Sequence, residues 1–95
     1  MARYRPDIPP RVAEVIRHLP PEVKRGIRTA IQAISGDPAL GEPLQRELEG
    51  IMKYRVRRYR VVYTVERKSK TIRIMAVGHR RAVYEELADL VRRSR

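Results

Sequence analysis

The chain has 95 residues, enough for one small domain, and it carries 22 Lys and Arg against 11 Asp and Glu, a formal charge of +11. So strong a positive charge is typical of proteins that bind polyanions. The absence of cysteine excludes disulfides and thiolate zinc sites, and no apolar run is long enough for a signal peptide or membrane helix, so we expect a cytoplasmic protein without membrane contacts.

The first half of the chain predicts a helix hairpin. Residues 2–10 can hold at most a short edge strand, because each of their prolines removes a donor from a strand ladder. Apolar residues at helical spacing then predict one helix over residues 10–19 and a second over residues 21–36. The Pro20–Pro21 pair ends the first helix and begins the second, so the two should pack side by side.

The second half changes to the period of strands. Residues 37–50 are typical of a loop, with a short turn around residues 44–48. We expect strands over residues 52–57, 59–66 and 71–77, with RKSK as the turn between the second and the third. A final helix is expected over residues 82–93. We therefore predict a single α+β domain over residues 1–95, in which an N-terminal helix hairpin packs on a small antiparallel sheet and a C-terminal helix follows.

The stretch KYRVRRYRVVY, residues 53–63, places five cations among strand-forming residues. Ten of the eleven excess charges lie in residues 51–95, which hold fourteen Lys and Arg against four Asp and Glu. Alternation puts Arg55 and Arg57 on one face of a strand and lets Arg60 join them from the next. Such a face can simply be a solvated one, but residues 53–60 contain no acid, and arginine suits phosphate. The pattern favours an anion-binding sheet face.

A second group of polar residues lies in VGHRRAVYEEL, residues 77–87. His79 and Arg80 follow a predicted strand, and Tyr84 lies just inside the next helix. An imidazole, a guanidinium and a phenol at such a junction can handle protons and anions. The plainer interpretation is a hydrogen-bonded strand end with solvated arginines. The two histidines lie far apart and there is no cysteine, so we expect no metal site. The sequence contains no nucleotide-binding motif, so we expect no cofactor.

The run LEGIMKYRVRRYRVVYTV, a polar turn and IRIMAVGHRRAVYEEL together resemble the RelE branch of the RelE/ParE toxin superfamily of type II toxin–antitoxin systems. The resemblance covers almost the whole chain, including the "DP…GEPL" loop. It implies a microbial-ribonuclease-like fold and metal-independent, ribosome-dependent cleavage of mRNA in the decoding site, which inhibits translation. It also implies an acidic antitoxin as partner, which should cover the basic face.

The resemblance also implies which residues form the site. The catalytic positions fall on Glu42, Arg57, Arg60, His79, Arg80 and Tyr84. The side chains expected to bind RNA are Lys53, Arg55, Arg57, Arg58 and Arg81. His79 matches a position that is lysine in some relatives, and Glu42 matches a carboxylate that some members place near the scissile phosphate.

Cleavage of this kind needs a base for the ribose 2′-hydroxyl, an acid for the departing 5′-oxygen and cations for the charge that builds on phosphate. A guanidinium stays protonated, which leaves His79 or Glu42 as the base, and we rank His79 first because imidazole accepts protons near neutral pH. Tyr84 is the candidate acid or a stacking platform. Two alternatives remain: a ParE-like inhibitor of DNA gyrase without nuclease chemistry, and a non-catalytic nucleic-acid-binding module.

Overall fold

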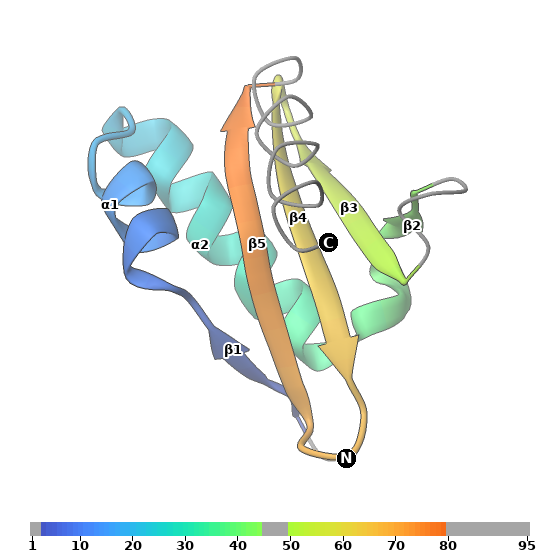
Figure 1. The fold of residues 1–95 in the computed structure, drawn as a ribbon. Coiled ribbons are helices and arrows are strands. Elements are labelled where there is room, and N and C mark those ends of the chain that lie inside the picture. Colours follow the sequence, from blue (N-terminus) through green and yellow to red (C-terminus); the bar gives the residue numbers. More distant parts are fainter. Residues whose placement is uncertain (1–2, 45–49, 80–95) are drawn as a thin grey trace.

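The computed structural model describes residues 3–44 and 50–79, and it shows two helices against one face of a five-stranded sheet (Figure 1). The elements in chain order are β1 (Arg5–Asp7), α1 (Pro10–Arg17), α2 (Pro21–Gly36), the 3-10 helix η1 (Pro38–Leu40), β2 (Glu42–Pro43), β3 (Ile51–Val56), β4 (Tyr59–Glu66) and β5 (Thr71–His79). This arrangement confirms the expected α+β class.

Both helices begin where the prolines predict. Pro10 and Pro21 occupy the first helical positions, where a missing N–H leaves no hydrogen bond unmade. The first helix is shorter than expected and ends at Arg17, whereas the second runs to Gly36 as predicted. Their apolar stripes face the sheet, and Ile27 and Ile34 of α2 are completely buried there. Burial of this stripe is what holds the hairpin against the strands.

The strand order is β1-β5-β4-β3-β2, and the neighbouring pairs from β2 to β5 are antiparallel, as expected. The short N-terminal edge strand also forms, but β1 runs parallel to β5 and makes the sheet mixed. The segment expected to be a loop contains η1 and the two-residue strand β2. The small strand β2 therefore closes one edge of the sheet, at the right of Figure 1.

One strand ends earlier than predicted. Val56 pairs with Tyr59, so Arg57 and Arg58 form a two-residue turn, and Arg57 has a positive φ of 56°. The prediction that Arg57 shares a strand face with Arg55 is therefore wrong. The physical reason is the tight connection: a two-residue hairpin takes both residues out of the ladder and needs a positive φ at its first position.

The two faces of the sheet pack differently. The helix side contains the main core, in which Tyr63, Val61 and Ile74 are fully buried. The other side carries a small cluster around Val62 and Ala76. The predicted helix over 82–93 and residues 45–49 of the predicted turn lie outside the described residues. Within the described ranges, no helix is both long and apolar enough to cross a bilayer.

Candidate functional site

A pocket of about 220 Å³ opens where the η1–β2 segment meets the β3–β4 hairpin. Its lining residues are Leu40, Gly41, Glu42, Lys53, Tyr54, Arg55 and Arg60. The structure thus brings together four residues that the sequence analysis selects for the site: Glu42, Lys53, Arg55 and Arg60. Three cations and one carboxylate around a small space can hold a phosphate group and place an oxygen base beside it.

Strand register explains why these side chains meet. Glu42 of β2 pairs with Lys53 of β3, and Arg55 of β3 pairs with Arg60 of β4. Residues paired directly across antiparallel strands point to the same face, and so do residues two apart on one strand. All four charged groups therefore project from the sheet face opposite the helices. Arg55 opposite Arg60 is a repulsive cross-strand pair, an arrangement that a bound anion would stabilise.

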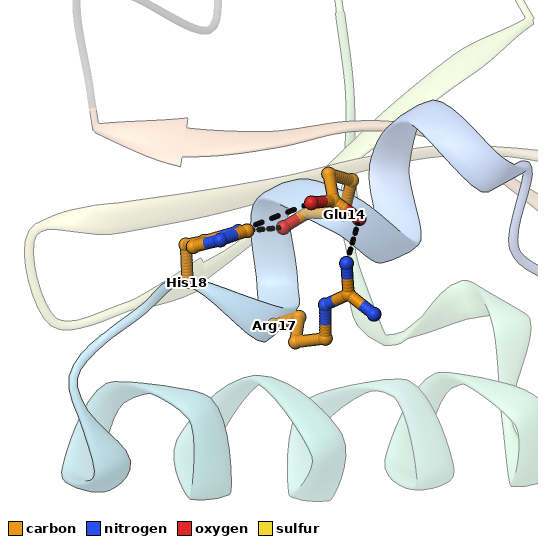
Figure 2. A network of polar contacts seen from close by, with 3 residues as sticks. All are labelled: Glu14, Arg17 and His18. Carbon is orange, nitrogen blue, oxygen red and sulfur yellow. Dashed lines mark hydrogen bonds and ion pairs between the residues drawn. The ribbon is translucent and has the colours of Figure 1, made fainter.

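The ion pairs of the described region lie elsewhere in the molecule. Glu14 of α1 binds Arg17 and lies 3.5 Å from Nδ1 of His18, as Figure 2 shows, and Asp7 contacts Arg73 at 3.2 Å. His18 therefore belongs to the surface of the first helix and not to the pocket. Arg60 uses its guanidinium to donate to the backbone oxygen of Tyr59 at 3.1 Å. Among the described residues, no carboxylate within ion-pair distance neutralises the three cations of the pocket.

The wall that carries Glu42 is fastened to the core by one side chain. Tyr63 of β4 is completely buried, and its hydroxyl donates to the backbone oxygen of Pro38 at 2.8 Å. The hydroxyl oxygen of Tyr63 in turn accepts from the backbone N–H of Gly41 at 3.1 Å. Desolvation raises the pKa of the Tyr63 hydroxyl, while the hydrogen bond from Gly41 opposes that shift. The phenol thus stays protonated as the donor that its contact with Pro38 requires.

Gly41 is needed where it lies because the chain approaches the sheet very closely. A Cβ added there would come within 2.6 Å of the Lys53 carbonyl oxygen and within contact distance of the Tyr63 hydroxyl. Neither Gly41 nor Tyr63 is selected by sequence reasoning. Gly41 offers a weak signal in "GEPL", but Tyr63 reads simply as one apolar position of an alternating strand.

The two arginines of the turn lie apart from the pocket. Arg57 and Arg58 line a separate depression of about 320 Å³ between the hairpin tip and the start of α2. Its other lining residues are Glu22, Val23, Gly26, Val56 and Tyr59. Of the predicted catalytic arginines in the described region, Arg60 is therefore in the pocket and Arg57 is not.

His79 lies on the opposite face of the sheet from the cationic pocket. It pairs with Tyr59, and the two rings meet edge to face with centroids 5.5 Å apart. Tyr59 packs against the main core on the helix side. The described geometry therefore separates His79 from Glu42 and Arg60. Arg80, Arg81 and Tyr84 lie outside the described residues, and their predicted roles stay predictions.

Metal chemistry finds no support among the described residues. In residues 3–44 and 50–79, no three His, Asp or Glu side chains come together as a metal site would need. The pocket has one carboxylate among three cations, and that balance repels a metal ion and attracts an anion.

Known proteins resemble this chain in sequence and in fold. Residues 11–84 match the model of a family described as the ParE toxin of type II toxin–antitoxin systems. The chain belongs to the RelE/ParE toxin family. The toxin is also 32% identical, over 71 residues, to Toxin RelG of Mycobacterium tuberculosis; the match covers 73% of this chain and 82% of that protein.

Two solved structures extend the likeness to the whole fold. The toxin–antitoxin complex RelBE2 from M. tuberculosis matches with a TM-score of 0.76 and 28% identity, covering 84% of this toxin and 94% of the matched chain. A mutant of E. coli toxin RelE in the free state matches with a TM-score of 0.77, covering 94% and 98% of the two chains. At 22% identity the second match shows the fold alone. The resemblance expected from the sequence is confirmed.

Proposed function

We propose that this toxin is a ribosome-dependent mRNA endonuclease that inhibits translation in the cytoplasm. The observation that carries the proposal is the meeting of Glu42, Lys53, Arg55 and Arg60 in one pocket. RNA cleavage by its own 2′-hydroxyl forms a bond from that oxygen to phosphorus and breaks the bond to the 5′-oxygen. The phosphate gains charge on the way, and preorganised cations at that point lower the barrier.

Glu42 is the proposed base in this reaction. It shares the pocket with Arg55 and Arg60, which would hold the phosphate, whereas His79 lies on the other sheet face beside Tyr59. A base must reach the proton that it removes, so position decides before acidity does. The carboxylate would take the 2′-hydroxyl proton, and the arginines, which cannot lose theirs, would stabilise the phosphate. Tyr84 remains the proposed acid for the 5′-oxygen.

The proposed protein partner is an acidic antitoxin. The matched M. tuberculosis structure is a toxin–antitoxin complex, and ten of the eleven excess charges of this toxin lie in residues 51–95. An acidic segment laid across the open face of β3 and β4 would neutralise the pocket and exclude RNA.

Inhibition of DNA gyrase is the second candidate function, because the matching family model is described as the ParE toxin. A gyrase inhibitor needs no carboxylate poised among phosphate-binding cations, and this is why we favour the nuclease. A plain nucleic-acid-binding module would likewise need the cations without Glu42.

The test of the nuclease is a single-turnover assay. We expect the purified toxin to cut mRNA on programmed ribosomes and to leave gyrase supercoiling unaffected, with antitoxin-bound toxin as the inactive control. Gyrase inhibition without RNA cleavage would establish the ParE-like alternative. Binding of RNA with neither activity would leave the non-catalytic module.

The cationic pocket also predicts how RNA binding depends on salt. Replacing Arg55 or Arg60 by Ala should weaken affinity and reduce the slope of log K against log salt by about one each, because each removes one phosphate contact. Lys68→Ala is the matched control, since Lys68 lies in the turn at the opposite end of β4. Equal slopes for Arg60→Ala, Lys68→Ala and the unmodified toxin would show that RNA binds elsewhere.

A further inference from the structure

We propose that Tyr63 is a positioning residue for the pocket: its buried hydroxyl holds Gly41 in place and thereby fixes where the Glu42 carboxylate lies. The inference rests on the proposed function for the meaning of Glu42, but the placement itself can be tested without catalysis.

The hydroxyl of Tyr63 fastens both ends of one short segment. It donates to the Pro38 oxygen at 2.8 Å and accepts from the Gly41 N–H at 3.1 Å. It therefore bridges the first residue of η1 and the residue that directly follows the end of η1. The ring itself cannot move, because Tyr63 is completely buried in the middle of the main core. A rigid side chain that reaches from the central strand to an edge segment transmits the order of the core to the pocket wall.

Around Glu42 the segment is held by a short ladder as well as by Tyr63, because Glu42 pairs with Lys53 and Pro43 with Met52. The strand β2 is two residues long, and its second residue, Pro43, has no N–H to donate to β3. After this short ladder, the Leu44 N–H donates to the Ile51 oxygen at 2.9 Å. Before Gly41, the carboxylate of Asp37 accepts a hydrogen bond from the Ala39 N–H and so stabilises the start of η1. The hydrogen bond between Gly41 and Tyr63 is thus the side-chain anchor directly before Glu42.

The contact between Gly41 and the sheet is close as well as polar. A Cβ at Gly41 would overlap the Lys53 carbonyl oxygen, and the lack of one lets the segment lie against β3. Glu42 then pairs with Lys53 and faces the same pocket as Arg55. Loss of the Tyr63 hydroxyl would leave the Pro38 oxygen and the Gly41 N–H without their partner, and the segment would shift to find water.

A binding cycle tests the placement. The variants are Tyr63→Phe, Glu42→Gln and their combination, and the probe is a short 2′-O-methyl RNA, which has no nucleophile and cannot be cut. In the toxin that keeps Tyr63, Glu42→Gln removes a negative charge beside the phosphate of the probe. This change should tighten RNA binding by about threefold or more. In the Tyr63→Phe background the carboxylate is no longer held there, so Glu42→Gln should change affinity by less than about twofold.

Tyr4→Phe is the matched control. Tyr4 also packs against the main core, but it precedes β1, at the opposite edge of the sheet from β2. It should leave the effect of Glu42→Gln unchanged. Thermal melting should show that Tyr63→Phe is folded, with a melting temperature lower by at least about 4–8 °C, because the variant loses both hydrogen bonds of the hydroxyl. The Gly41 amide should exchange faster in Tyr63→Phe, while core amides of β4 stay protected.

The outcomes separate this inference from the proposed function. If Glu42→Gln tightens RNA binding equally with Tyr63 and with Phe at this position, or if the Gly41 amide exchanges at the same rate in both, the positioning role is disproved. If the cycle shows coupling but the unmodified toxin cuts no RNA, the positioning role stands and the nuclease proposal fails. If the toxin does cut RNA, Tyr63→Phe should lower kcat and leave KM nearly unchanged.

Discussion

Replacing Glu42 by Gln is expected to slow cleavage of ribosome-bound mRNA by roughly 10²–10⁴-fold, the usual loss when an acid–base group is removed. Gln keeps the shape of the side chain but cannot take a proton from the 2′-hydroxyl. Binding of RNA should persist, because Lys53, Arg55 and Arg60 still line the pocket. The measurement is a single-turnover rate at saturating toxin, which separates chemistry from binding and release.

Two variants make this result decisive. Glu66→Gln removes a carboxylate from the far end of β4 and should leave the rate unchanged. His79→Gln removes the imidazole next to Tyr59 and should also leave the rate nearly unchanged. A large loss in His79→Gln together with full activity in Glu42→Gln would return the role of base to His79, the residue that the sequence alone ranks first.

The sequence favours His79 as the base, whereas the structure favours Glu42, and this difference has a specific structural cause. Ile72 and Ile74 of β5 face the helices, and strict alternation from them would place His79 on the open face, with the arginines. Tyr63 pairs with Ile74 but Val62 pairs with Ala76, so Met75 is an extra residue in the ladder. This bulge reverses the alternation and turns His79 to the helix side. No local sequence pattern around Met75 predicts this bulge.

The cationic pocket was more accessible to sequence reasoning. Alternation within β3 places Lys53 and Arg55 on the same face. The pairing of Arg55 with Arg60 follows from the short connection between β3 and β4 in the sequence. The short connection also explains why the prediction for Arg57 is wrong: a two-residue turn takes Arg57 and Arg58 out of the ladder. Charge and period could thus predict most of the anion-binding side chains but not the place where the strand ends.

The attachment of the pocket wall could not be predicted. The alternating pattern identifies Tyr63 as a core position, and the structure confirms that it is buried. Its hydroxyl, however, reaches residues more than twenty positions away, Pro38 and Gly41, across the edge of the sheet. Such a contact depends on how the loop before β2 folds back, and loop paths carry little periodic signal.

The close approach of this loop to the sheet predicts that a single added methyl group, at Gly41, lowers the stability of the fold. Gly41→Ala places a Cβ within 2.6 Å of the Lys53 carbonyl oxygen and against the buried Tyr63 hydroxyl. Neither atom can move away, because the first belongs to a paired strand and the second to a fully buried side chain. Since the φ of Gly41 is an ordinary −77°, the penalty comes from contact alone. We expect a loss of about 1–3 kcal/mol in the free energy of unfolding.

The same substitution should also damage the site, because the segment can avoid the clash only by lifting Glu42 off β3. A displacement of about 1 Å at a catalytic group can slow a reaction by roughly 10²-fold. Gly26→Ala is the matched control: its Cβ would meet only Cγ1 of Val56, at 3.1 Å, and the gain of up to about 1 kcal/mol in helix propensity opposes that contact. Denaturant unfolding and single-turnover cleavage of both variants provide the measurement. If Gly41→Ala were as stable and as active as Gly26→Ala, the wall beside Glu42 would be free to move and its close contact with β3 would have no role in the site.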